Sequence, residues 1–194
     1  MGCGGVRDKL TANGQWTLDG SDGELLLHTG VTGTAARMGH RLTIAMRSWQ
    51  ATVQWSGDDP VEVAVTVDLE SLDVIRGEGG VTPLSGAEKK LVRANATKSL
   101  RTGKFPHARF RSTAIERDTD VIRLIGTLEI NGRAGEQTVD IRVEDDGDSW
   151  RISGAAVVAH TDFGIKQYSM MMGAMKVADE VRVTFAAGHL KATA

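Results

Sequence analysis

The chain has 194 residues, of which 41% are hydrophobic and 25% charged, and its formal net charge is -2 at pH 7. These values are typical of one globular domain with a sizeable core, and they argue against a nucleic-acid-binding protein, which is normally basic. A single cysteine, Cys3, excludes an internal disulfide framework and any multi-cysteine metal site.

The N-terminal sequence shows no targeting signal. No run of about 18 apolar residues occurs, so we expect no integral membrane segment. Residues 1–9 lack the apolar stretch of a secretory signal. We therefore expect a flexible N-terminal segment over residues 1–15, a single domain over residues 16–190, and a cytoplasmic location.

Residues 40–55 form the first distinctive element, because their apolar alternation changes phase. The apolar positions are even in the first half and odd in the second: Leu42, Ile44 and Met46, then Trp49, Ala51, Val53 and Trp55. One strand cannot keep both sets on one face unless an extra residue enters near Arg47 and Ser48. The sequence therefore predicts a bulge or sharp bend there, which lets a long sheet curl.

Period-two alternation marks further segments as half-buried antiparallel strands. The apolar positions are the odd ones over 61–69, then Ile122, Leu124, Leu128 and Ile130, then Val139, Ile141 and Val143, then Trp150, Ile152, Gly154, Ala156 and Val158, and finally Val181, Val183 and Phe185. Turn signals lie between them at Asn131-Gly132 and at residues 145–148. Such short spacings favour consecutive hairpins.

One helix interrupts the strands. Ser85 and Glu88 have the spacing of a capping box, residues 87–100 are rich in Ala, Lys and Leu, and Gly103 is the expected stop. We expect its inward stripe to contain Leu84, Leu91, Ala94 and Leu100, and we expect the glycine-rich residues 77–80 before it to form a loop.

These elements predict a mainly β fold: a single antiparallel β-barrel of about eight strands with one helix at about residues 85–100. A sandwich is the alternative. The long bent strand favours the barrel, because closing a barrel requires strongly coiled strands.

No catalytic constellation is present. The chain has no nucleophile elbow, no phosphate-binding loop and no zinc-protease motif, and its five histidines are scattered: His28, His40, His107, His160 and His189. We therefore predict no enzyme activity, no catalytic residue, no metal site and no cofactor.

A methionine cluster stands out at Met170, Met171, Met172 and Met175. Three interpretations are open. Methionine can fill irregular gaps in a core, it can line a flexible apolar cavity, or its thioether can bind a soft metal.

Several short motifs occur in an order that is informative. They are Gly39-His40 with Trp49 downstream, Asp68-Leu69-Glu70-Ser71-Leu72, Lys104-Phe105-Pro106 through Phe110, Gly126-Thr127-Leu128-Glu129-Ile130-Asn131-Gly132, Thr161-Asp162-Phe163-Gly164-Ile165, and Val177-Ala178-Asp179-Glu180-Val181. In this order, over residues 16–187, the chain resembles the YceI-like family.

The resemblance implies an extended, lipocalin-like barrel that binds a polyisoprenoid, an isoprenoid quinone or a fatty-acid-like chain in its interior. The family contributes no established catalytic residues, many members are periplasmic, and the resemblance allows a homodimer. The partner expected here is a small amphiphilic lipid, and a bound isoprenoid or acyl lipid would be a ligand rather than a cofactor.

The residues predicted to contact this ligand are His40, Leu42, Trp49, Phe105, Phe110, Phe163, Tyr168, Met170, Met172 and Met175. His40 matches the early strand histidine of the family and would either contact a head group or join a hydrogen-bond network. The phenylalanines can serve as core or as ligand contacts, since a barrel wall has both roles. Tyr168 carries a hydroxyl suited to a head group.

The leading hypothesis is non-catalytic carriage or sequestration of a long-chain lipid. One alternative is a metal-dependent or stress-related enzyme on the same barrel that uses His40, His160 and the methionines. Another is a filled barrel that acts as an interaction module.

Overall fold

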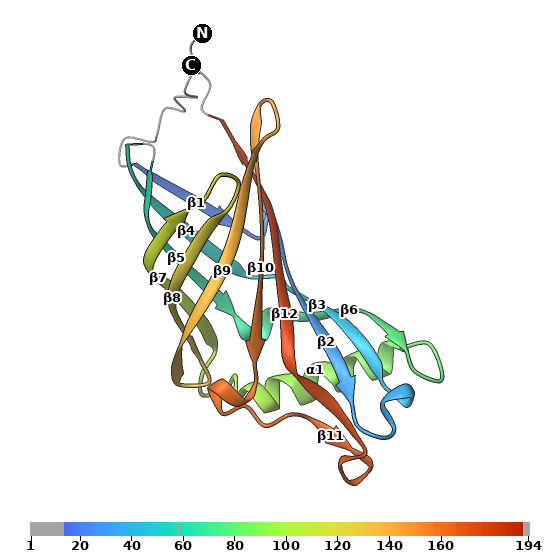
Figure 1. Ribbon diagram of the computed structural model, residues 1–194. Coiled ribbons are helices and arrows are strands. Elements are labelled where there is room, and N and C mark those ends of the chain that lie inside the picture. Colours follow the sequence, from blue (N-terminus) through green and yellow to red (C-terminus); the bar gives the residue numbers. More distant parts are fainter. Residues whose placement is uncertain (1–13, 58, 192–194) are drawn as a thin grey trace.

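The computed structural model describes residues 14–57 and 59–191, and its main feature is one antiparallel sheet that curls around an interior (Figure 1). The strands are β1 (Gln15–Asp19), β2 (Gly23–Thr32), β3 (His40–Met46), β4 (Trp49–Ser56), β5 (Asp59–Asp68), β6 (Leu72–Gly79), β7 (His107–Arg117), β8 (Ile122–Ile130), β9 (Arg133–Asp145), β10 (Ser149–Ala159), β11 (Ser169–Met170) and β12 (Met175–Leu190). The helix is α1 (Gly86–Leu100), and short 3-10 turns are η1 (Ala36–Met38), η2 (Leu69–Ser71), η3 (Thr161–Phe163) and η4 (Met171–Gly173).

The sheet follows the order β1-β4-β5-β7-β8-β9-β10-β12-β2-β3-β6, with β11 paired to the start of β12. The pair β4-β5 near one end of this order and the pair β3-β6 at the other belong to one bent hairpin, because β3 leads directly into β4 and β5 leads through η2 into β6. At the bend, the Arg47 N–H donates to the Ser71 carbonyl (3.2 Å) and the Asp68 N–H donates to the Ser48 carbonyl (2.9 Å). The sheet therefore turns back on itself.

The predicted phase change is confirmed. β3 ends at Met46 and β4 begins at Trp49, and both of these side chains are buried. Residues 47 and 48 lie between the two strands, and they shift the inward-facing positions from even to odd numbers.

The predicted count of about eight strands is wrong, since the sheet has 12. Bends divide two long segments into β3 with β4 and β5 with β6, and the short strands β1 and β11 add two more. β1 has five residues, near the lower limit for recognising an alternation, and β11 has only two, which is too few.

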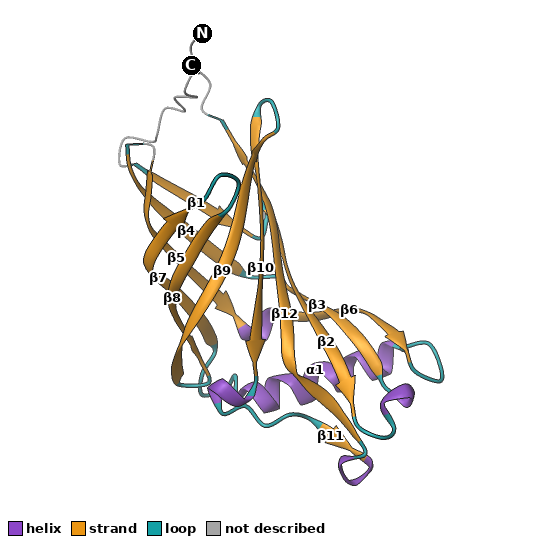
Figure 2. Cartoon of the chain, in the orientation of Figure 1, coloured by secondary structure: helices purple, strands orange, loops and turns teal. Residues whose placement is uncertain are grey.

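The capping box of α1 is confirmed, and the helix crosses one end of the curled sheet (Figure 2). The Ser85 hydroxyl accepts from the Glu88 N–H (3.3 Å), and the Glu88 carboxylate accepts from the Ser85 N–H (2.7 Å). The predicted stop at Gly103 is wrong, because Arg101 caps the helix in the left-handed conformation with φ 55°.

The predicted inward stripe of α1 needs a correction. Leu91 is 59% exposed, whereas Val92, Ala96 and Leu100 pack against the core, together with Leu84 ahead of the helix. The helix has few large apolar residues, so the sequence defines its inner face poorly.

The loop predicted at residues 77–80 is largely part of β6, which extends to Gly79 and pairs there with His40. A Cβ atom at Gly77 would lie 3.1 Å from both the Cβ of His40 and the Cδ2 of Leu84. The absence of a side chain at Gly77 therefore allows this close packing.

The predicted hairpin turns are confirmed. Asn131 and Gly132 join β8 to β9 with φ values of 56° and 72°, which suit a two-residue turn. Gly147, with φ 77°, lies in the turn between β9 and β10. The expectations for residues 1–13, including Cys3, fall outside the described residues. None of the helices in the described part of the chain is long and apolar enough to cross a membrane.

Candidate ligand-binding site

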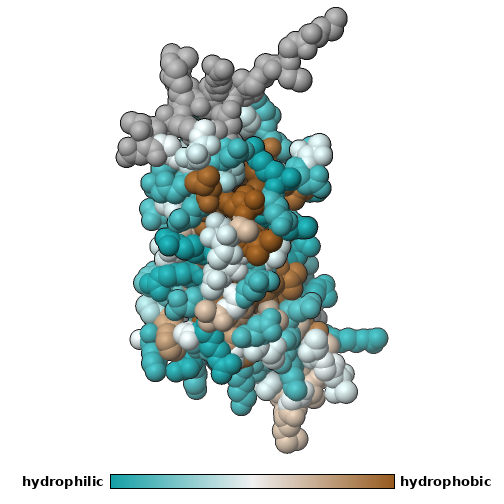
Figure 3. All heavy atoms as spheres, turned by 60° about the vertical axis from the view of Figure 1, so that its left-hand side comes forward, coloured by the Kyte–Doolittle hydropathy of each residue, from teal (hydrophilic) through white to brown (hydrophobic). Residues whose placement is uncertain are grey.

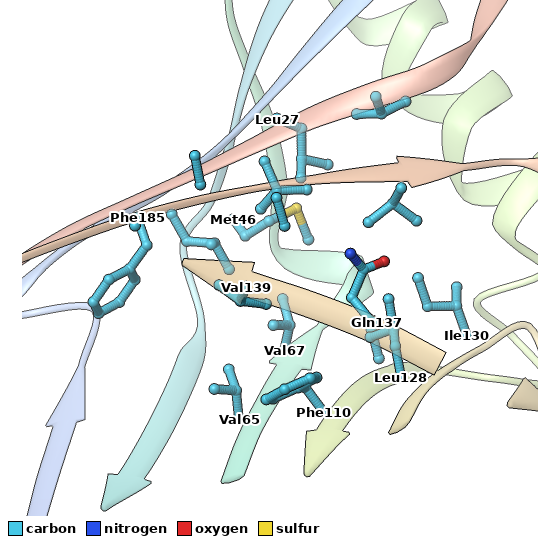
Figure 4. Close-up of a pocket in the computed structure, with 18 of the residues that line it drawn as sticks. Leu27, Met46, Val65, Val67, Phe110, Leu128, Ile130, Gln137, Val139 and Phe185 are labelled. Atoms are coloured by element: carbon cyan, nitrogen blue, oxygen red, sulfur yellow. The ribbon is translucent and has the colours of Figure 1, made fainter. Parts of the chain in front are cut away.

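The curled sheet encloses a cavity of about 420 Å³ (Figure 4). This volume lies within the range of small-molecule binding pockets. Period-two alternation builds the wall, since every second side chain of each strand points inward. The apolar wall residues labelled in Figure 4 are Leu27, Met46, Val65, Val67, Phe110, Leu128, Ile130, Val139 and Phe185.

Most of the polar side chains of the lining belong to the end covered by α1. Asn95 and Ser99 come from α1, and His160, Lys166 and Tyr168 come from the segment that connects β10 to β12. The cavity therefore has an aliphatic body and one polar end.

Gln137 is a polar exception in the middle of the wall, among aliphatic side chains (Figure 4). Backbone pairing between β9 and β10 stops at Asp140 and Ala155, which leaves carbonyl groups beyond this point without a ladder partner. The Gln137 side-chain amide donates to two of them, the carbonyls of Thr138 (2.9 Å) and Val157 (3.2 Å). Gln137 therefore bridges the place where the two strands separate.

Two tryptophans mark the end of the cavity away from α1. The rings of Trp16 and Trp55 lie 4.6 Å apart between centroids, and Trp16 also stacks on His189 at 4.4 Å. Both tryptophans also line a second pocket of about 680 Å³, whose other walls include Arg117 and Arg142. The paired rings thus lie between the apolar cavity and a polar outer pocket, and Figure 3 shows hydrophobic atoms at the surface of this upper half of the molecule.

Of the ten predicted ligand contacts, Leu42, Phe110 and Tyr168 line the cavity. Trp49 is buried outside the lining, where its ring meets Phe185 edge-on at 5.1 Å between centroids.

His40 and Phe105 also lie outside the cavity lining. The His40 Nε2 is 2.7 Å from the Thr82 carbonyl oxygen, so this side chain belongs to a hydrogen-bond network with the loop before α1. The cationic groups of Arg101 and Lys104 lie over the Phe105 ring, at 4.9 and 5.3 Å from its centroid.

Phe163 is also buried, and it lies outside the cavity lining. Only 2% of it is exposed, and the Asn131 Nδ2 donates to its carbonyl oxygen (3.1 Å). Its ring meets the backbone of Gly135, where an added Cβ would lie 3.4 Å away. Phe163 thereby ties the η3 turn to the β8–β9 hairpin.

The three remaining predicted contacts, Met170, Met172 and Met175, belong to the hairpin that contains β11 and η4. Met170 and Met172 are exposed, and Met175 pairs with Met170 in the β11–β12 ladder. None of the three lines the cavity.

Sequence reasoning missed several lining residues, of which Gln137 is the clearest. Val139, Ile141 and Val143 define the inner face of β9, and continuing the same period by one step reaches Gln137. The inner residues of α1 had no comparable signal, because they depend on how the helix is rotated over the sheet.

Asp179 holds the polar end of the cavity in place. It lies in an irregular part of β12, between Val177 and Val181, and its carboxylate accepts from the Thr161 N–H (3.0 Å) and the Thr161 hydroxyl (2.6 Å). The hydroxyl hydrogen bond is the main cause that lowers the pKa of Asp179, with smaller contributions from the Thr161 N–H and the charge of His160.

We expect the substitution Asp179→Asn to lower the melting temperature near neutral pH. A carboxyl with a lowered pKa in the folded state stabilises the fold above its unfolded pKa of about 3.9, and this contribution is lost as the pH falls through the lowered value. The difference between wild type and D179N should therefore be present above about pH 5 and shrink below about pH 4. Thermal unfolding followed by circular dichroism across this range checks it. A difference independent of pH would show that the charge of Asp179 is not involved.

The two histidines named for a metal-dependent alternative each lie against a backbone carbonyl oxygen. The His160 Nδ1 is 2.7 Å from the Asp179 carbonyl oxygen, whereas His40 contacts Thr82. Over residues 14–57 and 59–191, no group of three or more His, Cys, Asp or Glu side chains is arranged to hold a metal ion.

The fold and the cavity together define a class: a curled antiparallel sheet of the barrel type that encloses an apolar cavity, with a helix across one end. The chain belongs to the YceI-like family, since the model of the YceI-like domain matches residues 16–188. This confirms the resemblance found in the ordered motifs.

Solved structures share the fold. The crystal structure of Burkholderia cenocepacia BcnA is 19% identical, with a TM-score of 0.69 over 89% of this chain and 99% of that chain. A Campylobacter jejuni YCEI protein is 12% identical, with a TM-score of 0.57 over 77% of this chain and 85% of that chain. No curated protein matches the chain.

Proposed function

We propose that this protein binds a long-chain amphiphilic lipid, such as a polyisoprenoid, an isoprenoid quinone or a fatty acid, and carries or sequesters it without catalysis. The observation that supports this most directly is the cavity of about 420 Å³ with an aliphatic wall. Each buried methylene contributes about 0.8 kcal/mol, so ten of them give roughly 8 kcal/mol before ordering costs. Before those costs are subtracted, this corresponds to a dissociation constant on the order of 1 μM.

The polar end of the cavity indicates how such a ligand is oriented. Lys166 and Tyr168 offer a cation and a hydroxyl beside Asn95 and Ser99 of α1, and the opposite end is lined by the paired tryptophan rings. We place the head group at the α1 end and the apolar chain along the strands. A carboxylate or phosphate head group suits Lys166, because an ammonium group attracts anions.

Mass spectrometry tests this proposal. The protein as purified is first examined by native mass spectrometry, and its bound lipids are then extracted with organic solvent. The delipidated protein is titrated with oleate and, separately, with geranylgeraniol. We expect a co-purifying lipid or uptake of at least one probe at about one per chain. An apo mass combined with no uptake of either probe would contradict lipid binding.

The cytoplasmic location stays a prediction. The metal-dependent or stress-related enzyme has no specific observation in its favour among the described residues. Metal analysis of the purified protein separates the two functions, since stoichiometric copper or zinc would favour the enzyme.

A further inference from the structure

A hairpin of exposed apolar side chains projects from the α1 end of the molecule. We call residues Tyr168–Gly173 the methionine tip. Within it, Met171 is 52% exposed and Met172 is fully exposed. β11 and its turn lie at the lower extremity in Figure 1, and Figure 3 shows apolar atoms projecting from the same end.

The backbone of the methionine tip is strained in a way that presents these side chains outward. Met171 and Met172 have φ values of 52° and 53°, in the left-handed region that glycine adopts without cost. Non-glycine residues in this conformation are uncommon, and such outliers cluster at functional positions. Met172 is fully exposed, so packing among the described residues does not offset its strain, and about half of Met171 is exposed as well. A role for the side chains outside the chain accounts for them.

The surroundings of the tip are cationic. The 3-10 turn η1 lies beside it, joined by a hydrogen bond from the Ala35 N–H to the Ala174 carbonyl (2.9 Å). Residues 33–38 and 164–176 contain three cations, Arg37, Lys166 and Lys176, and no acidic residue. Among the described residues, none of the three cations is in an ion pair.

The tip is also continuous with the polar end of the cavity. Lys166, Tyr168 and Val177 line the cavity, and the Val177 N–H donates to the Tyr168 carbonyl (2.9 Å). Whatever binds the tip therefore lies next to the polar end of the cavity.

We propose that the methionine tip docks on the surface of an anionic lipid bilayer. Met171 and Met172 enter the interface between head groups and acyl chains, and Arg37 and Lys176 lie at the level of the lipid phosphates. Apolar side chains flanked by cations are the combination that binds a protein to an anionic membrane surface. This docking goes beyond ligand binding and does not require it, although it would bring the polar end of the cavity close to the membrane lipids.

Flotation with vesicles tests the proposal, using delipidated full-length protein. The probes are vesicles of phosphatidylcholine alone and vesicles with about one third phosphatidylglycerol, an anionic lipid. We expect binding to the anionic vesicles only. Removing two interfacial cations in R37Q/K176Q should weaken binding roughly 30-fold, and M171S/M172S should weaken it at least about tenfold.

Matched variants control for charge and hydrophobicity. R109Q/R111Q removes two cations from β7, which lies four strands away from β12 in the sheet order. V61S/V157S removes two exposed valines from the outer surfaces of β5 and β10. Each of these two control variants should bind the anionic vesicles as the wild type does. M171L/M172L should retain binding, and the melting temperature of each variant shows that it folds.

Three results would overturn the proposal: no flotation of the wild type, flotation of M171S/M172S equal to the wild type, or a concentration-dependent dimer that M171S/M172S abolishes. The last would identify the tip as a contact between two copies of the chain. Because vesicle binding is measured without a cavity ligand, its failure is distinguishable from failure of the lipid-uptake experiment.

Discussion

The substitution Ala156→Phe should abolish most of the lipid affinity while leaving the fold intact. Ala156 is a small residue of the cavity lining on β10, so a ring at this position occupies space that the ligand chain needs. Displacing about four methylene-sized units at 0.8 kcal/mol each costs about 3 kcal/mol, which corresponds to a loss in affinity of roughly 150-fold.

The neighbouring residue supplies the control for this experiment. Val157 lies on the same strand with its side chain outward and 52% exposed, so V157F adds a similar ring without entering the cavity. Titration with oleate should give a wild-type dissociation constant for V157F and a much larger one for A156F, at similar melting temperatures. Equal affinities would show that the ligand does not occupy this part of the cavity.

Phe163→Ala should have the largest effect on stability among the predicted ligand contacts. Removing a fully buried phenylalanine leaves a void and costs about 3–5 kcal/mol. For a chain of this size that corresponds to a fall in melting temperature of about 10 °C. The ring lies against Gly135, and its loss would also loosen the turn that Asn131 anchors.

Two variants separate a structural role of Phe163 from a ligand contact. F163L keeps most of the buried volume and should recover most of the stability. F105A removes a partly exposed ring and should cost less than F163A. If F163A instead retained its melting temperature and lost oleate affinity, Phe163 would be a ligand contact, as the sequence alone predicted.

Local signals explain which parts of the fold were predictable. The phase change between Met46 and Trp49 and the capping box of Ser85 depend on residues close in the chain, so the sequence shows them directly. The strand count and the rotation of α1 depend on distant partners. Leu91 is exposed because the helix presents Val92 and Ala96 to the sheet, a choice that its own few apolar residues do not determine.

The candidate site shows the same division. Alternation correctly marks Leu42 and Phe110 as inward, but it does not distinguish an inward side chain that lines a cavity from one, such as Trp49, that packs against a neighbour. Phe163 illustrates the difficulty further, because its burial depends on the distant hairpin at Asn131.

The sequence by itself determined the family, the antiparallel alternating strands, the bend at residues 47–48 and the start of the helix, because each is carried by local spacing or by ordered motifs. Only the tertiary structure decided that the sheet curls around a cavity with its polar end under α1, and that the methionines lie outside it on a strained turn. The physical reason is that curvature and the pairing of distant strands decide which apolar side chains pack together, which face an open interior and which face the solvent.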